Sequence, residues 1–310
     1  MHHTEHDKSH NTSIRMSLDY IHSNLDSDLS LEKLAAVSNY SAFHFQRLFK
    51  EHTGETPKQY VIRLRLERIA HFLKVFPNLS ISELSEDSGF ASLSTFSRAF
   101  KNYYGITPEE FKNLPHSHIR KNCKTNSKNC KNNLPDHSEF WSKGFSESEI
   151  MEWKDKVEIS VKSITGLTVA FISTLLDDRD AITHAFRDVK QVASARMMIN
   201  QETKFMGMLL DIPFITPLEK CRYRAGITVS STMQIPRELS TTKIPHGPYA
   251  SYKVKGNTMS VVKSLIYFKH SWLDGSGYQL KDITGYEIFD SSPADRPSEQ
   301  IVREILIPLK

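Results

Sequence analysis

The sequence contains few cysteines and no long hydrophobic run. Its three cysteines, Cys123, Cys130 and Cys221, are too few to form a disulfide framework, and their odd number suits a reducing compartment. No apolar stretch reaches the length that crosses a bilayer, and the first ten residues lack the apolar core of a secretion signal. We therefore expect a cytoplasmic protein that has no membrane partner.

The usual signatures of catalysis and metal binding are missing as well. Cys123 and Cys130, with the histidines near them, match no standard zinc spacing. No nucleophile forms an evident pair with a general base. We therefore predict no catalytic residue, no metal site and no cofactor. The net charge of +4 is small, so the positions of the charges say more about partners than their sum.

Composition divides the chain into three parts. Residues 12–113 are dense in helix signals, and the residues before them are expected to form a flexible tail. Residues 114–153 are rich in Asn, Lys, Ser and His and lack apolar periodicity, which is typical of a basic, polar linker. Residues 154–310 contain alternating apolar stretches typical of half-buried strands, with helical stretches between them. This order favours a helical domain followed by an α+β domain.

An internal repeat is the strongest pattern in the sequence. The segment LAAVSNYSAFHFQRLFKEHTGETPKQY, which starts at Leu34, is matched by LSEDSGFASLSTFSRAFKNYYGITPEEF, which starts at Leu84. Asn39 and Gly89 occupy the same place in the two copies, where the turn between two short helices favours a positive φ. Each copy therefore has the order of a helix-turn-helix unit.

Both copies end in the same helix start. Thr56-Pro57-x-Gln59 and Thr107-Pro108-x-Glu110 each combine a capping Thr, a Pro at the first helical position and a closing Gln or Glu. The segment RLRLERIAHFLKVF between the copies predicts one continuous helix. Such a helix would hold the two units at the separation of successive major grooves on one face of DNA, about 34 Å.

The helix after each turn is expected to read DNA. We expect this helix at about Ser41–Glu51 in the first unit and Ser92–Tyr103 in the second. Arg suits guanine edges and Gln suits adenine edges, whereas Lys contacts phosphate. The candidate DNA-binding residues from this argument are His44, Gln46, Arg47, Lys50, Ser94, Thr95, Ser97, Arg98 and Lys101. Because Gln and Arg occur together only in the first helix, we predict that it carries most base discrimination and that the second contributes more to positioning.

The alternative is a structural helical bundle whose Arg and Gln only form a solvated face. Residues 12–112 hold twelve basic and twelve acidic residues, so this part is neutral and must segregate its charges by face if it binds DNA. Two copies with matching turns, caps and exposed Arg favour a sequence-specific DNA-binding regulator.

The two segments LEKLAAVSNYSAFHFQRLFKEHTGETPKQYVIRLRLERIAHFL and ISELSEDSGFASLSTFSRAFKNYYGITPEEF resemble the DNA-binding domain of AraC/XylS-type regulators, in particular the stress-response activators among them. The resemblance covers residues 12–113. It implies seven helices, two of them in successive major grooves, with promoter DNA in the nucleoid and RNA polymerase as partners. It also places Phe43, Gln46 and Arg47 at base-contacting positions, with an apolar contact from Phe43 to thymine.

The second part of the chain shows a weaker duplication, namely a strand, a helix and a strand pair, twice. Six motifs resemble the GyrI-like effector-binding domain: Tyr223–Ile227, Ile244-Pro245-x-Gly247-x-Tyr249-Ala250, Trp272-Leu273, Ser276-Gly277-Tyr278, Tyr286-Glu287-Ile288 and Ile305-x-Ile307-Pro308-Leu309. The resemblance implies two pseudo-twofold β-α-β-β units with a cleft between them. The predicted fold is therefore multidomain: an all-α double helix-turn-helix domain followed by an α+β domain of two pseudo-twofold β-α-β-β units.

The same resemblance places Glu287 in an aromatic pocket that binds an effector. A buried carboxylate is costly unless a positive or hydrogen-bonding group meets it, and aromatic faces attract cations. We therefore expect a small-molecule effector, either a hydrophobic cation or another amphipathic molecule. The rings are expected to come from Tyr249, Tyr252, Trp272, Tyr278 and Tyr286.

Three alternatives stay open for this domain at this point. Glu287 could end a strand and point to solvent while the rings fill the core. The domain could hydrolyse a small molecule with Glu287 as the general base. It could also be a protein-interaction module that binds no ligand. The fusion to a DNA reader favours sensing over catalysis.

Overall fold

The computed structural model describes residues 3–76, 79–86, 88–113, 148, 151–176, 180–211, 215–216, 220–282 and 284–310, and within them the side chains of residues 3–12, 75, 258 and 270 are not described. The chain divides into two compact units, residues 1–133 and 134–310. Almost all of the predicted linker, residues 114–153, lies outside the described residues, and so do Cys123 and Cys130.

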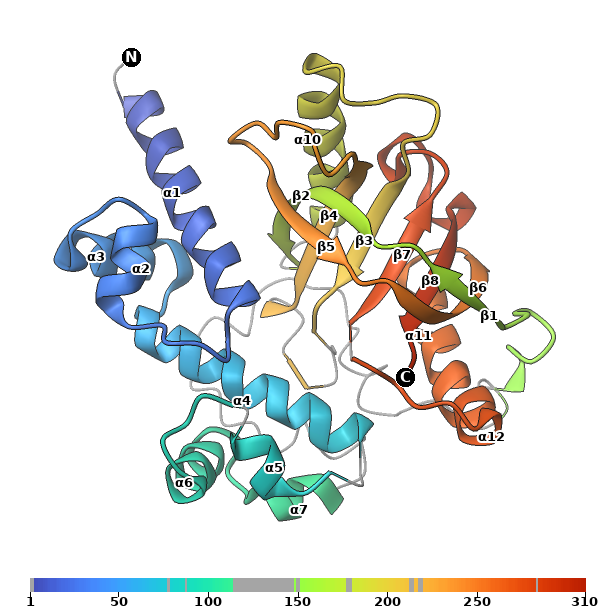
Figure 1. Ribbon diagram of the computed structural model, residues 1–310, viewed down its shortest axis with the longest axis horizontal. Helices are drawn as coiled ribbons and strands as arrows, with labels where there is room; N and C mark the ends of the chain where they lie inside the picture. Colours follow the sequence, from blue (N-terminus) through green and yellow to red (C-terminus); the bar gives the residue numbers. More distant parts are fainter. Residues whose placement is uncertain are drawn as a thin grey trace. The chain divides into compact units, whose positions relative to one another are not determined.

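The described part of the first unit contains seven α-helices (Figure 1). They are α1 (His3–Ser23), α2 (Leu31–Val37), α3 (Ala42–Thr53), α4 (Pro57–Val75), α5 (Ile81–Glu86), α6 (Leu93–Tyr104) and α7 (Pro108–Asn113). The helix number agrees with the resemblance. The expectation of a flexible tail was wrong in one respect, because α1 begins at His3 and includes most of the residues before 12.

Local capping determines where these helices begin and end. The capping box of Thr56 and Gln59 opens α4 as predicted, and Ser41 caps α3 by accepting the backbone N–H of His44. Asn39 has φ +58° and Gly89 has φ +72°, so both turns use the left-handed conformation that the repeat predicts.

Each half of the first unit packs its own core against α4. In the first half, Phe45 and Phe49 on α3 are fully buried, and the ring of Phe49 packs edge to face on Tyr60 of α4 with a centroid distance of 5.3 Å. In the second half, Phe100 on α6 meets Phe111 of α7 in the same way, also at 5.3 Å. Each fully buried ring stabilises the unit by about 1.5–3 kcal/mol relative to exposure. The apolar faces of α3 and α6 are therefore buried in the core.

Arg65, near the middle of α4, joins the two halves. Its Nε donates to the backbone oxygen of Leu25 at 2.9 Å and its Nη2 to that of Ser27 at 2.8 Å, both between α1 and α2. Its Nη1 donates to the backbone oxygen of Gly89 at 2.8 Å, in the second helix-turn-helix turn. One guanidinium thus links the first half of the unit to the second.

The second unit is built on an eight-stranded antiparallel sheet (Figure 1). Its strands are β1 (Ser160–Ile164), β2 (Leu167–Leu175), β3 (Phe205–Leu209), β4 (Arg222–Val229), β5 (Ser240–Ile244), β6 (Gly247–Lys255), β7 (Gly285–Phe289) and β8 (Val302–Pro308). The helices with described bounds are α10 (Ala181–Ala195), α11 (Thr258–Tyr267), a π-helical turn (Phe268–Leu273) and α12 (Asp274–Ser276), followed by 3-10 turns at Pro293–Asp295 and Ser298–Gln300.

The sheet confirms the predicted duplication. The strand order is β1-β6-β8-β7-β3-β4-β2-β5, and all pairs are antiparallel. The sequence β2-α10-β3-β4 is repeated as β6-α11-β7-β8, and the two repeats meet where β3 pairs with β7. Gly207 on β3 faces Glu287 on β7 at this central pair.

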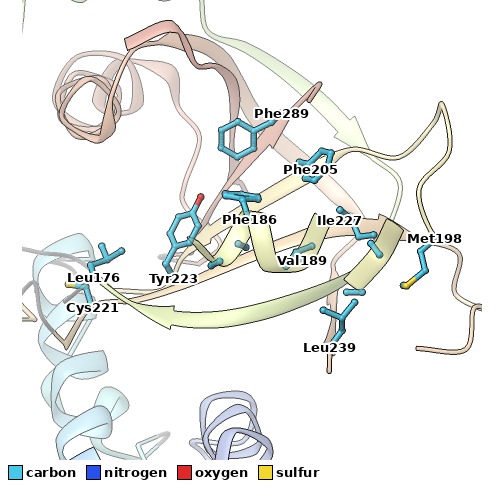
Figure 2. Close-up of a cluster of buried hydrophobic side chains, with 14 residues drawn as sticks. Leu176, Phe186, Val189, Met198, Phe205, Cys221, Tyr223, Ile227, Leu239 and Phe289 are labelled. Carbon is cyan, nitrogen blue, oxygen red and sulfur yellow. The ribbon is translucent and has the colours of Figure 1, made fainter. Parts of the chain in front are cut away.

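Both helices cover the face of the sheet that carries Glu287. Pairing runs from Tyr252 through Ile305, Glu287 and Gly207 to Ala225, so these residues share one face. Helix α10 packs Phe186 on this face, within a core of rings and aliphatic side chains (Figure 2). The hydroxyl of Tyr223 points from this core towards the side on which Phe289 lies (Figure 2).

Candidate DNA-reading helices and effector site

The buried face of α3 determines which of its side chains are exposed. With Phe45 and Phe49 in the core, the opposite positions face outward. Of the predicted DNA-binding residues, Gln46, Arg47 and Lys50 are exposed. Phe43 is 84% exposed at the second residue of the helix, so its ring is accessible on the outer face.

His44 stands apart from the other predicted residues of α3. It is half-buried, its ring meets Tyr40 edge to face at 4.9 Å, and its Nδ1 lies 3.4 Å from Arg47 Nη2. These contacts orient the Arg47 side chain on the outer face of the helix. His44 therefore has a positioning contact that the sequence did not reveal.

The exposed face of α6 differs in composition. Ser94, Arg98 and Lys101 are exposed, whereas Thr95 and Ser97 are half-buried. Ser92 caps the helix by accepting the backbone N–H of Thr95, and its hydroxyl also lies 2.9 Å from that of Thr95 and 3.1 Å from that of Ser94. Two of the three predicted hydroxyl readers, Ser94 and Thr95, thus already make hydrogen bonds at the cap.

One exposed residue of α6 was missed by sequence reasoning. Leu93, the first residue of the helix, is 44% exposed although it is apolar. The first residues of a recognition helix are those that approach base edges. The signal was present, because Leu93 follows the capping Ser92 directly, but the predicted set contained only polar residues of this helix.

In the second unit, Glu287 is buried and not solvent-facing. Only 8% of the residue is exposed. Its Oε1 accepts a hydrogen bond from Arg303 Nη1 at 2.8 Å, and its Oε2 accepts one from the hydroxyl of Tyr223. Burial, together with the neighbouring carboxylate, raises the pKa of Tyr223 well above its ordinary value, so the phenol stays protonated and donates.

The duplication explains why these two side chains meet at one carboxylate. Ala225 pairs with Gly207, and Ile305 pairs with Glu287. Tyr223 and Arg303 each lie two residues before the paired residue, so they occupy equivalent positions in the two repeats. Gly207, the counterpart of Glu287, leaves room for them, because a Cβ there would lie 1.9 Å from the Tyr223 hydroxyl oxygen.

Three of the five predicted rings lie in one stack. Tyr252 stacks on Phe268 with a centroid distance of 6.1 Å, Phe268 on Trp272 at 5.4 Å, and Trp272 on Tyr278 at 6.0 Å. The stack runs from the buried Tyr252 to Tyr278, which is 41% exposed. Tyr252 lies two strands from Glu287 on the same face, about 10 Å away.

Tyr249 is separated from this stack. It lies three residues before Tyr252 on β6, and strand alternation therefore places the two on opposite faces of the sheet. Its ring meets Tyr286 at 6.2 Å, within a second core that includes Met206 and Leu306. The structure thus places Tyr249 and Tyr286 on the face of the sheet opposite to Glu287.

Comparison with known proteins covers both units. A model of the helix-turn-helix domain matches residues 34–113, and a model of the GyrI-like small molecule binding domain matches residues 157–310. The chain is 42% identical over 99 residues to the multiple antibiotic resistance protein MarA of Escherichia coli, which is 32% of this chain and 77% of MarA. The chain belongs to the AraC-type transcription regulators.

One further sequence relative and one solved structure are also similar to parts of this chain. The probable transcription factor PqrA of Proteus vulgaris is 34% identical over 100 residues, covering 31% of this chain and 81% of PqrA. The solved C-terminal domain of EcmrR is 16% identical, with a TM-score of 0.42, and covers 50% of this chain and 98% of that domain. At this TM-score, the second similarity supports no argument about the AraC-type regulator.

Membership in this family confirms the main predictions from sequence. The chain is an AraC-type DNA-binding transcription regulator with a GyrI-like small-molecule-sensing domain, and it is a regulator rather than an enzyme. None of the helices in the described ranges is long and apolar enough to span a membrane.

Sequence reasoning assigned no site role to three residues of the sensing domain of this AraC-type regulator. They are Tyr223, Phe268 and Arg303. Arg303 had a detectable signal, because the alternation Arg303-x-Ile305-x-Ile307 places a charged residue on the apolar face of a strand. A buried Arg in that pattern needs acceptors that compensate its charge. A cationic ligand of Glu287 would therefore compete with Arg303.

Proposed function

We propose that the first unit reads a bipartite promoter site, with α3 and α6 in successive major grooves. The observation that carries this is the arrangement of two helices of equal length, each opened by a Ser cap after a left-handed turn, on either side of one continuous α4. The proposed DNA contacts on α3 are Phe43, His44, Gln46, Arg47 and Lys50. Those on α6 are Ser94, Thr95, Ser97, Arg98 and Lys101, to which the exposed Leu93 is added.

Substitution of the two exposed arginines tests this assignment. Binding of a labelled duplex should be lost in Arg47→Ala/Arg98→Ala and should weaken steeply with salt in the wild type, because phosphate contacts release counterions. The matched control is Arg187→Ala, an exposed arginine on α10. Sequence-specific binding that survives in the double variant would refute the assignment of the reading residues.

We infer a division of labour between the two helices. Gln46 and Arg47 offer bidentate groups on α3, whereas the hydroxyls of Ser94 and Thr95 on α6 are tied to the cap. Base substitutions in the α3 half-site are therefore expected to cost more affinity than those in the α6 half-site. Equal losses in both half-sites would count against this division.

We also propose that the effector contacts the ring stack and the group formed by Glu287, Arg303 and Tyr223, called here the Glu287 group. Tyr252, Trp272 and Tyr278 offer faces that run from the interior to the surface, and Glu287 lies on the same side of the sheet. A ligand that stabilises the folded protein raises its melting temperature. Trp272→Ala should abolish that rise, whereas Tyr249→Phe, on the opposite face, should preserve it. A domain that acts only through protein contacts would show no rise with any compound in a broad screen.

RNA polymerase is the protein partner that we propose. This rests on membership in a family of transcription regulators. With purified polymerase, the protein should change the yield of transcript from its own promoter. No change with or without effector would exclude polymerase as the partner.

A further inference from the structure

Glu287 offers no unoccupied carboxylate oxygen to a positively charged ligand. Within the described residues, Oε1 is taken by Arg303 and Oε2 by Tyr223. The single negative charge of Glu287 is matched by the single positive charge of Arg303. A cation placed beside this neutral group would be desolvated without meeting an uncompensated negative charge.

Arg303 is held firmly in this position. Its Nη2 donates to the backbone oxygen of Gly256 at 2.6 Å, and its guanidinium lies 5.3 Å from the centroid of the Phe289 ring. Only 7% of Arg303 is exposed. Displacing it to admit a cation would break a buried ion pair and two further contacts, which is strongly unfavourable.

The one atom of the Glu287–Arg303 pair that still lacks a hydrogen-bond partner among the described residues is a donor. Arg303 Nε is buried and has no hydrogen-bond partner among the described residues. A buried N–H is satisfied by an acceptor such as a carbonyl, ether or phosphoryl oxygen. The same group therefore disfavours a cation and favours a ligand that carries an acceptor oxygen.

We propose that the effector is an uncharged molecule with an aromatic or apolar body and an acceptor oxygen, and that Arg303 is the residue that excludes cations. This inference rests on the effector site proposed above. The apolar body packs on the stack formed by Tyr252, Phe268, Trp272 and Tyr278, and the oxygen accepts from Arg303.

Two probes of closely similar shape and different charge test this selectivity on the full-length protein. Triphenylphosphine oxide is neutral and has a strong acceptor oxygen, whereas methyltriphenylphosphonium is a cation without one. Calorimetric titration of the wild type should show binding of the oxide that is at least about tenfold tighter than binding of the phosphonium.

The variant Arg303→Gln removes the internal positive charge and keeps the carboxyl group of Glu287. It should bind the phosphonium at least about tenfold more tightly than the wild type does. The double variant Glu287→Gln/Arg303→Gln should lose this gain, because the carboxylate that attracts the cation is gone. Thermal unfolding of each variant shows whether its second unit is folded.

Each result decides the proposal. A wild type that binds the phosphonium as tightly as the oxide would overturn it, as would a folded Arg303→Gln that keeps the wild-type ratio. If Arg303→Gln does not fold, the wild-type ratio decides alone. Binding of neither probe to the wild type and the folded variant would refute the effector site itself, and the selectivity with it.

Discussion

The two helix-turn-helix turns show how much a single residue determines. Asn39 and Gly89 both have a positive φ, but only Gly89 is also crowded, since a Cβ there would lie 2.5 Å from Cζ of Arg65. We predict that Asn39→Gly leaves the stability of the first unit nearly unchanged. Gly89→Ala should lower it by about 1–2 kcal/mol from backbone strain alone, and further by displacing Arg65. Urea unfolding followed by circular dichroism measures both. Equal effects of the two substitutions would contradict this explanation.

Gly207 is a second position where one added carbon has a predictable effect. Its Cβ would lie 1.9 Å from the hydroxyl oxygen of Tyr223 and 2.7 Å from Oε2 of Glu287. Gly207→Ala should therefore destabilise the second unit by about 1–3 kcal/mol, as overpacking does. Gly275→Ala is the control, because nothing lies within 4 Å of its added carbon, and it should change stability by less than about 0.5 kcal/mol. A harmless Gly207→Ala would mean that the Tyr223 contact is absent in solution.

Single residues also mark the limit of sequence reasoning. The turn at Asn39 and the capping box at Thr56 were predictable because each depends on residues next to it in the chain. The Glu287 group was not, because its two partners come from strands whose register no local pattern specifies. The burial of Glu287 could be expected, but its pairing with Arg303 could not.

Among the elements, α4 has the central role, because it carries the residue that links the two halves. Arg65 bonds backbone oxygens of both. Arg65→Gln should weaken binding to the natural bipartite site about tenfold. It should also reduce the penalty for inserting one base pair between the half-sites, because the reading helices are no longer held at one separation.

The matched control for this prediction is Arg68→Ala on the same helix. Arg68 pairs with Asp26 at the surface, where ion pairs contribute about 0–1 kcal/mol. It should change neither affinity nor spacing preference. The spacing series is measured by titrating labelled duplexes. An unchanged preference in Arg65→Gln would show that Arg65 does not set the separation.

Elements were predicted better than their ends and irregularities. The continuous α4 and the two strand-helix-strand-strand repeats follow from apolar periodicity over many residues. The early start of α1 and the π-helical turn at Phe268–Leu273 do not, since neither alters that periodicity. The π-helical turn matters for the site, because it carries Phe268 and Trp272 into the ring stack.

At the scale of the molecule, the neutral charge of the first part is compatible with DNA binding. Arg63 is buried between Glu55 and Glu67, so some acidic charge is neutralised inside the unit. Arg47, Lys50, Arg98 and Lys101 are exposed on the reading helices. Segregation of charge by face, which DNA binding requires of a neutral domain, stays a prediction that these four exposed basic side chains support.

The central claim is that one chain reads two half-sites with two helices. It is tested most directly by titrating the full-length protein with the natural bipartite duplex and with duplexes in which either half is scrambled. We predict that each scrambling weakens binding, more strongly for the α3 half, at about 1–3 kcal/mol per base pair contacted. Scrambling the α3 half should cost Arg47→Ala less affinity than it costs the wild type, and scrambling the α6 half should cost Arg98→Ala less. If scrambling one half leaves the affinity of the wild type unchanged, only one helix reads DNA and the claim is wrong.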